Sequence, residues 1–195
     1  MGAFLTKGYD VIPNVVSVVR NLELLSGLPK IANSGLRTLL TMPLFFKAAM
    51  CLNQDSRLQA YLSGLMPIQC IYFRKTRAHN WSLKLHRDTV IPLRGDGPWS
   101  AGSKKEGLVS VRPPRTFLDR CVAVRLSLDE VAEGDLRLVE GSHLNSQQYS
   151  LADTIRPVVP KCGALDFRPS MMHGSAKLLD AESRRVLHYL FVPQN

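Results

Sequence analysis

Cysteine is scarce in this sequence, and no two cysteines stand in a Cys-x-x-Cys pair. This spacing disfavours a paired-cysteine metal or redox site and a disulfide-stapled secreted domain. We expect all four cysteines to be reduced packing residues of a cytoplasmic protein: Cys51, Cys70, Cys121 and Cys162.

A long uninterrupted apolar run is also missing. The best apolar stretch runs from Leu36 to Leu52 and contains Arg37, Pro43 and Lys47, so it does not predict a membrane span. Residues 1–19 have neither the basic start nor the clean apolar segment of a secretory signal. We therefore expect a cytoplasmic location and no membrane partner.

Acidic residues are outnumbered, because 25 Lys and Arg stand against 16 Asp and Glu and leave a formal net charge of +9. This excess favours an anionic partner, such as a carboxylate or phosphate substrate or a coenzyme, unless it reflects only a generally basic surface. The basic residues are spread along the chain, and no platform for stacking bases is visible, so we do not expect nucleic acid. A small-molecule substrate is the expected partner, and the oligomeric state stays open.

The size and composition suit one globular domain. The chain has 195 residues, of which 45% are hydrophobic and 21% charged, and it shows no repeat or low-complexity segment. Such a chain can build a real core. We expect a single domain over residues 1–195, with a helical N-terminal part (1–63) and a strand-rich core (67–192).

Residues 14–63 show the spacing of apolar side chains that is typical of helices. Asn33 or Ser34 is placed to cap the second helix, and Pro43 is placed to start a further one. Two apolar helix faces are expected, one made by Val15, Val18, Val19, Leu22 and Leu25 and the other by Leu36, Leu39, Leu40, Leu44 and Phe45.

From residue 67 the apolar residues come in short runs separated by turn residues. The runs expected to form strands are 68–73, 81–90, 121–128, 136–139, 163–167 and 186–192. Gly and Pro punctuate residues 92–116, which predicts a long loop. Its part from Arg94 to Arg115 is either a lid or substrate wall, or a solvated surface loop. Helices followed by many short strands predict an α+β fold built round an antiparallel sandwich or barrel.

One short string carries the chemistry, His86-Arg87-Asp88. In a strand the side chains of residues i and i+2 point to the same face, so this imidazole and this carboxylate should lie side by side. A distant His173, followed by Arg184, completes the pattern of a facial triad. Such triads hold non-haem Fe(II) and leave positions free for a substrate acid and O2.

Each of these residues also has a simpler interpretation. Asp88 could form an ordinary ion pair, His173 alone is more typical of a structural residue, and His143 could satisfy backbone groups in its turn. His-Arg-Asp also occurs in kinase catalytic loops, but no Gly-rich loop precedes it, no Asp-Phe-Gly follows it, and the chain is too short. The combination of His173 with Arg184 favours the metal site.

The stretch from Gln69 to Val192 resembles the phytanoyl-CoA dioxygenase family, a branch of the Fe(II)/2-oxoglutarate oxygenases. The resemblance covers about two thirds of the chain. It rests on Asn80-Trp81 with His86-Arg87-Asp88, on Gly97 to Ser100 with Gly107 and Val111 to Pro114, on Gly134 to His143, and on Arg168-Pro169, His173 and Arg184 to His188. Lys84, Arg87 and Glu140 depart from the family pattern, which puts the substrate in doubt more than the iron.

The resemblance implies a double-stranded β-helix, or jelly roll, with the N-terminal helices packed on it. It implies His86, Asp88 and His173 as ligands of Fe(II). The arginine that binds 2-oxoglutarate in this family lies eleven residues after the second ligand histidine, and 173 + 11 gives Arg184. Arg185 points to the other face of the strand and is the fallback, while Ser175 is placed to hydrogen-bond the same carboxylate.

The implied activity is that of an Fe(II)/2-oxoglutarate-dependent dioxygenase, an oxidoreductase that hydroxylates a small-molecule metabolite or natural-product intermediate. 2-Oxoglutarate is the cosubstrate and is decarboxylated to succinate as the substrate is oxidised. Asp88 argues against halogenation, since related halogenases lack the carboxylate ligand. The alternative is a non-catalytic jelly-roll module that binds a ligand.

Overall fold

The computed structural model describes residues 2–31, 35–93, 99, 101–105, 108–130, 136–178 and 183–194. The helical elements are α1 (Gly2–Lys7), α2 (Val18–Ser26), η1 (Leu39–Thr41), α3 (Pro43–Gln54), α4 (Ser56–Leu62), α5 (Arg115–Leu118), η2 (Ser142–Leu144) and η3 (Leu151–Asp153). The strands are β1 (Tyr9–Ile12), β2 (Gly35–Leu36), β3 (Leu65–Thr76), β4 (Leu83–His86), β5 (Ile91–Leu93), β6 (Ala101–Lys105), β7 (Leu108–Val111), β8 (Val122–Ser127), β9 (Leu136–Leu138), β10 (Ala164–Phe167), β11 (His173–Ser175) and β12 (Ser183–Pro193).

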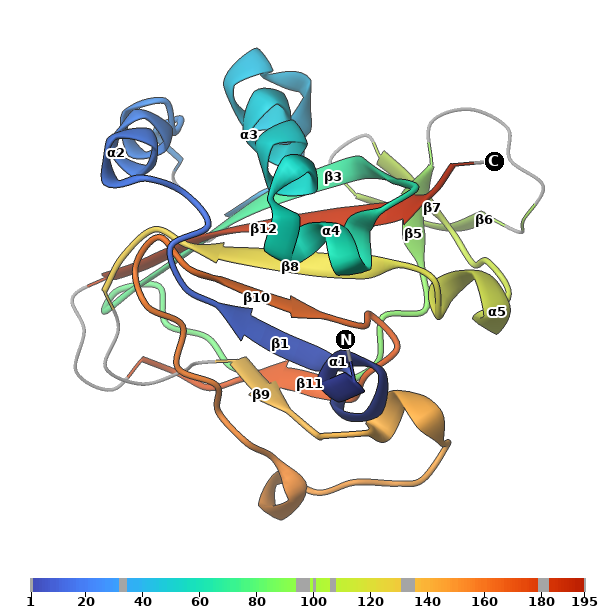
Figure 1. Ribbon diagram of the computed structural model, residues 1–195. Helices are drawn as coiled ribbons and strands as arrows, with labels where there is room; N and C mark the ends of the chain where they lie inside the picture. Colours follow the sequence, from blue (N-terminus) through green and yellow to red (C-terminus); the bar gives the residue numbers. More distant parts are fainter. Residues whose placement is uncertain are drawn as a thin grey trace.

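Within these residues the strands form three antiparallel sheets. The large sheet has the order β1-β10-β8-β12-β3-β2, and two smaller sheets have the orders β4-β11-β9 and β5-β7-β6. Helices α3 and α4 lie over one face of the large sheet, and β9 and β11 lie on its other side (Figure 1). The large sheet is therefore a central layer between helices and a second sheet.

Strand β8 contributes side chains to both faces of the large sheet, the face that packs on the helices and the face that packs on the second sheet. All six residues of the strand are buried. Val122 and Val124 belong to the core that the helices share, while Ala123 packs with β9 residues in the core between the sheets. Because side chains alternate along a strand, only a strand covered on both faces is buried throughout. The expected α+β jelly roll is confirmed.

The same alternation determines what β12 presents to each side. Leu187, Tyr189 and Phe191 belong to the helix-side core. Arg184 and His188, in the other phase of the strand, line a cavity between the sheets. This is the inward face that the sequence predicts for Arg184.

The helical prediction needs two corrections. The apolar face predicted for the first helix is only partly right. Val15 and Leu25 pack against the core, but Val18, Val19 and Leu22 are exposed, and α2 buries Asn21 and Leu24 instead. Asn21 donates a side-chain hydrogen bond to the Leu128 carbonyl at 3.0 Å, which holds that face inward. The second predicted helix is also wrong in part, since Leu36 lies in β2 and an α-helix begins only at Pro43, as expected for that proline. The proposed caps Asn33 and Ser34 lie outside the described residues.

The strand predictions hold for β3, β8, β9, β10 and β12, with β3 and β12 longer than expected. The strand expected over 81–90 covers only Leu83–His86, and the expected loop over 92–116 contains β6 and β7. The lid or wall expected over that loop lies in part outside the described residues. None of the described helices is long and apolar enough to cross a membrane.

The four cysteines are free thiols. Cys70, Cys121 and Cys162 are buried, as expected of packing residues, whereas Cys51 is exposed on α3 and does not pack.

Candidate metal centre

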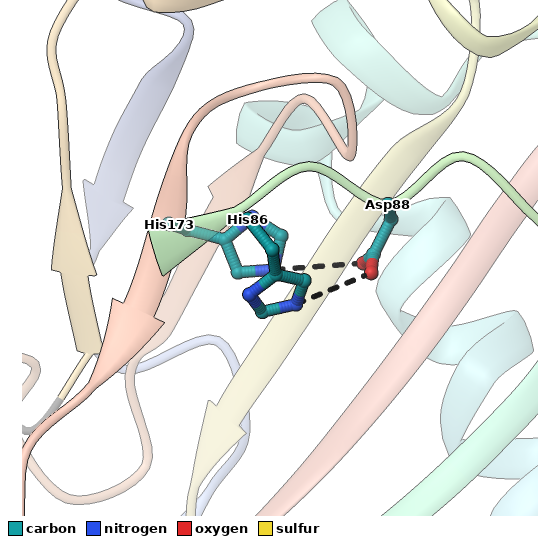
Figure 2. Close-up of side chains that lie close together, drawn as sticks. All are labelled: His86, Asp88 and His173. Carbon is teal, nitrogen blue, oxygen red and sulfur yellow. Dashed lines mark ion pairs between the residues drawn. The ribbon is translucent and has the colours of Figure 1, made fainter. Parts of the chain in front are cut away.

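Three side chains from two distant parts of the chain, residues 86–88 and residue 173, meet between the large sheet and the sheet β4-β11-β9. One ligand atom each of His86, Asp88 and His173 lies within 4.8 Å of the others. The Nε2 atoms of His86 and His173 are each 3.6 Å from an oxygen of Asp88, and both rings point toward this carboxylate (Figure 2). Two imidazoles and one carboxylate on one side of a small space are the donor set that suits non-haem iron.

The small sheet brings the two histidines together. His86 ends β4 and is the register partner of His173, the first residue of β11. Gly174 permits this close pairing, because a Cβ atom there would lie 2.7 Å from the Leu83 carbonyl oxygen. The glycine after the histidine thus belongs to the site, and sequence reasoning missed it.

Asp88 is positioned by a turn and not by the strand that the sequence predicts. β4 ends at His86, so the two residues do not share a regular strand. The Asp88 N–H instead donates to the Pro169 carbonyl at 3.0 Å, which holds the turn after β4 against the turn before β11. The carboxylate reaches the expected place through this turn and not through strand alternation.

Two departures from the family pattern, Arg87 and Glu140, have partners of their own away from the ligand atoms. Arg87 points its guanidinium to the carbonyls of Ser142, Ser170 and Asn145, so it ties the turn after β4 to neighbouring loops. Glu140 accepts a hydrogen bond from the Tyr9 hydroxyl at 2.8 Å.

His143 also lies outside the cluster. Its Nε2 is 3.0 Å from the Leu5 carbonyl oxygen, a partner in α1 and not in its own turn.

Backbone carbonyls set the tautomers of both cluster histidines. The Nδ1 of His86 lies 2.9 Å from the Lys84 carbonyl oxygen, and the Nδ1 of His173 lies 2.9 Å from the Met171 carbonyl oxygen. A carbonyl can only accept, so each Nδ1 carries the proton and each Nε2 keeps its lone pair for the space beside Asp88. Metal-binding histidines are held in this way by their second nitrogen, and the residues therefore fit a metal ion.

The charge states agree with this arrangement. Burial opposes ionisation of Asp88, but the neighbouring histidines outweigh it and lower the pKa of the carboxyl to about 2. The side chain is 39% accessible, yet it faces cavities and not the open surface. Burial lowers the pKa of His173, and the neighbouring Asp88 carboxylate raises the pKa of His86. At neutral pH Asp88 is a carboxylate and His173 a neutral imidazole, the forms that bind metals.

A cavity of about 180 Å³, here called the inner cavity, adjoins the cluster. Its lining includes Lys75, Arg125, Ser175 and Arg184, and Lys75 and Arg184 are only 1% and 4% accessible. Lys75 and Arg184 are register partners on β3 and β12. Lys75 and Arg184 thus lie side by side in the same cavity that the cluster lines. An anion bound in this cavity would be stabilised by their positive charges.

The two arginines that the sequence offers for 2-oxoglutarate have different surroundings in the structure. Arg185 pairs with Asp129 through its Nε and Nη2 atoms, the shortest contact being 2.6 Å. A simpler role for Arg184 would be an ordinary ion pair with Asp166 or Glu182. Neither Asp166 oxygen has a hydrogen-bond partner in the described part of the chain, and Glu182 lies outside the described residues. Arg184 and Ser175 lie beside the cluster as the sequence predicts.

Lys75, Arg125 and His188 are site residues that sequence reasoning did not assign. The Lys75 ammonium donates to Ser175 Oγ at 3.2 Å and to the Ala176 carbonyl, and lies 5.0 Å from the Trp81 ring centroid. His188 and Arg125 are register partners on β12 and β8. Burial and then Arg125 lower the pKa of His188 to about 3. For Arg125 a signal exists in the sequence, because it is the one charged residue in a predicted strand of mostly apolar residues. Lys75 and His188 have no comparable signal in their strands.

Solved structures with a similar fold are non-haem, 2-oxoglutarate-dependent enzymes. HygX from Streptomyces hygroscopicus with iron bound gives a TM-score of 0.71 at 19% identity, over 99% of this chain and 85% of that one. HygX with nickel, 2-oxoglutarate and hygromycin B gives 0.67 at 21%, over 98% and 85%. The alpha-ketoglutarate-dependent epimerase SnoN from nogalamycin biosynthesis gives 0.69 at 13%, over 98% and 81%.

No protein-family model matches the sequence, and no curated protein does. At identities this low the structural likeness speaks to the fold. The chain has the jelly-roll fold of these non-haem iron enzymes.

Proposed function

We propose that this chain is an Fe(II)/2-oxoglutarate-dependent dioxygenase of the phytanoyl-CoA dioxygenase type. It hydroxylates a small-molecule metabolite or natural-product intermediate in the cytoplasm. The observation that carries the proposal is the cluster of His86, Asp88 and His173, with both Nδ1 protons held by carbonyls and both Nε2 atoms turned to the carboxylate. Iron, nickel and 2-oxoglutarate in HygX, which has the same fold, support the choice of metal and cosubstrate.

His86 Nε2, His173 Nε2 and one Asp88 oxygen would hold the metal ion. When bound, Fe(II) supplies the activation of O2 that couples decarboxylation of 2-oxoglutarate to succinate with oxidation of a substrate C–H bond. Asp88 occupies the position that a halide would need, so we assign hydroxylation and not halogenation.

Arg184 and Lys75 would receive the distal carboxylate of 2-oxoglutarate in the inner cavity. A guanidinium forms two parallel hydrogen bonds with a carboxylate, and charge-assisted bonds of this kind are stronger than neutral ones. Ser175 adds a hydroxyl on the same side, already hydrogen-bonded to the Lys75 ammonium. These groups would hold the distal carboxylate at the end of the inner cavity away from the metal, which would leave the keto-acid end for the cluster.

The ring of Phe167 packs against the histidine ring of the cluster. Phe167 lies edge-on to His173, with ring centroids 5.2 Å apart, and also contacts His188. A fixed ring plane keeps the Nε2 lone pair of His173 aimed at one point, which metal sites need.

The proposal is tested by measuring consumption of 2-oxoglutarate and O2 with Fe(II) present. We expect succinate formation that a chelator abolishes, and none from an Asp88→Ala variant that has folded. A folded protein that is insensitive to chelators and consumes no 2-oxoglutarate would be a non-catalytic jelly-roll module instead.

A further inference from the structure

A large apolar cavity lies on the outer side of the cluster. It measures about 440 Å³. Most of its lining side chains are apolar, and we name it the apolar chamber after Leu40, Phe46, Pro67, Ile68, Trp99 and Phe117. The rings of Trp99 and Phe117 lie 4.6 Å apart between centroids and form one wall. The proposed chemistry at the iron uses none of these residues.

A middle cavity of about 330 Å³ lies between the apolar chamber and the cluster, because it shares lining residues with both. Both spaces are lined by Arg37, Gln69, Ile91, Pro92 and Leu108, so they meet along one shared wall. The middle cavity is also lined by His86 and Asp88, which in turn line the inner cavity. The cluster residues His86 and Asp88 therefore border both the polar inner cavity and the middle cavity, and the apolar chamber adjoins the middle cavity.

The two ends differ in the ligand they suit. Buried Lys75 and Arg184 at the inner end would favour a small anion. Aromatic and aliphatic side chains at the outer end gain free energy only by covering apolar surface. The volume of the apolar chamber falls within the range of about 300–1,000 Å³ that is typical of pockets for drug-sized molecules. A compact polar metabolite would reach the cluster without using this surface.

We propose that the apolar chamber holds the non-reacting part of the substrate, so that the substrate is an elongated molecule with a bulky hydrophobic portion. This inference rests on the proposed function, since it takes the cluster as the reaction centre. The reacting carbon lies in the middle cavity, next to His86 and Asp88. Phe46 stands at the rim of the chamber with 43% of its surface accessible, and Ile68 lies in its wall.

The test uses the metal-free protein and an apolar fluorescent anion, 1-anilinonaphthalene-8-sulfonate. Ile68→Trp fills the chamber, and Phe46→Asp makes its rim polar at an accessible position where folding is little affected. Val19→Asp is the matched control, because it removes an exposed apolar side chain from α2 and does not line the chamber. We expect at least a tenfold loss of probe affinity in the two chamber variants and no change in the control.

A ladder of alkyl carboxylates from hexanoate to decanoate measures the depth of the chamber by displacing the probe. Each methylene buried should strengthen binding about fourfold, from about 0.8 kcal/mol per CH2. In Ile68→Trp the gain should stop at a shorter chain. Probe binding that Val19→Asp weakens and the chamber variants leave intact would overturn the inference, as would a ladder without any gain.

The proposed function is followed separately in the same proteins. Anaerobic addition of Fe(II) and 2-oxoglutarate should produce the same weak visible charge-transfer band in all four proteins. If the probe behaves as expected and the band is absent, the apolar chamber stands and the proposed chemistry fails. If the band is present and the probe ignores the chamber variants, the chemistry stands and the inference fails.

Discussion

Replacing Arg184 with alanine should weaken 2-oxoglutarate binding without unfolding the protein. The guanidinium lies in the inner cavity with 4% of its surface accessible, next to Lys75. Hydrogen bonds to charged groups contribute roughly 1.5 to 3 kcal/mol each, and 1.4 kcal/mol corresponds to tenfold in affinity. Loss of one such bond predicts a dissociation constant raised about tenfold, and loss of the bidentate pair predicts roughly a hundredfold or more.

Arg185→Ala is the control, since it removes the same chemical group from the next residue of β12. Arg185 pairs with Asp129, whose side chain is only 14% accessible. Removing the arginine side chain leaves this mostly buried carboxylate with only the backbone N–H of residue 185, which donates at 2.8 Å, and the lost charged partner should cost about 1–3 kcal/mol. We expect a lower melting temperature and an unchanged affinity for 2-oxoglutarate.

The assay is calorimetric titration of 2-oxoglutarate into protein loaded with Fe(II) under anaerobic conditions, together with thermal unfolding of each variant. If Arg185→Ala weakens binding and Arg184→Ala does not, the assignment of the inward face of β12 is wrong by one residue. If neither variant weakens binding, the cosubstrate assignment is refuted.

Further predictions concern the cluster, the inner cavity and a buried carboxyl. Replacing His86, Asp88 or His173 with alanine should leave the protein folded while lowering Fe(II) affinity by more than the 10- to 100-fold typical of losing a supporting hydrogen bond; parent-like metal content in any of them, by elemental analysis, would contradict the triad. Lys75→Met should raise the 2-oxoglutarate dissociation constant about tenfold, and an unchanged constant would remove Lys75 from the site. Asp166 is fully buried, and burial followed by Asp10 raises its pKa from 3.8 to about 8. The folded state therefore keeps a proton that the unfolded state loses, so the stability that this group contributes is complete below about pH 4 and is lost as pH rises toward 8, by about 1.4 kcal/mol per pH unit. Asp166→Asn should remove this slope in urea unfolding measured from pH 5 to 8.5; equal slopes in the two proteins would show that Asp166 is ionised when folded.

The parts of the site that the sequence predicts are those that depend on local geometry. Strand alternation places Arg184 inward and Arg185 outward, and the structure has them so. The spacing of His86 and Asp88 also predicts their proximity, although the carboxylate arrives through the contact of Asp88 with Pro169 and not along a strand. The motif therefore predicts correctly that the two side chains are close, but it does not predict the backbone conformation that brings them together.

What the sequence does not reveal depends on long-range contacts. The apolar residues of α2 predict the wrong inward face, because the Asn21 side chain hydrogen-bonds to the Leu128 carbonyl. These two residues are 107 positions apart, so the spacing of residues within the helix cannot indicate this contact. Strand β6 has the sequence AGSKK, which shows no alternation of apolar and polar residues. The sequence therefore gives no sign of this strand, which forms by pairing with β7. Lys75 belongs to the site because it pairs with Arg184 on β12 and hydrogen-bonds to Ser175 and Ala176. All three partners lie about a hundred residues further along the chain, so the local sequence does not indicate these contacts.

The most direct test of the central claim is an anaerobic titration of the protein with Fe(II) and then 2-oxoglutarate, followed by visible absorption. The account predicts one Fe(II) per chain and a weak charge-transfer band that appears only when both are present. The band should be absent from His173→Ala and should need more 2-oxoglutarate in Arg184→Ala. A folded parent protein that binds no Fe(II), or that binds it and gives no band at saturating 2-oxoglutarate, would contradict the account.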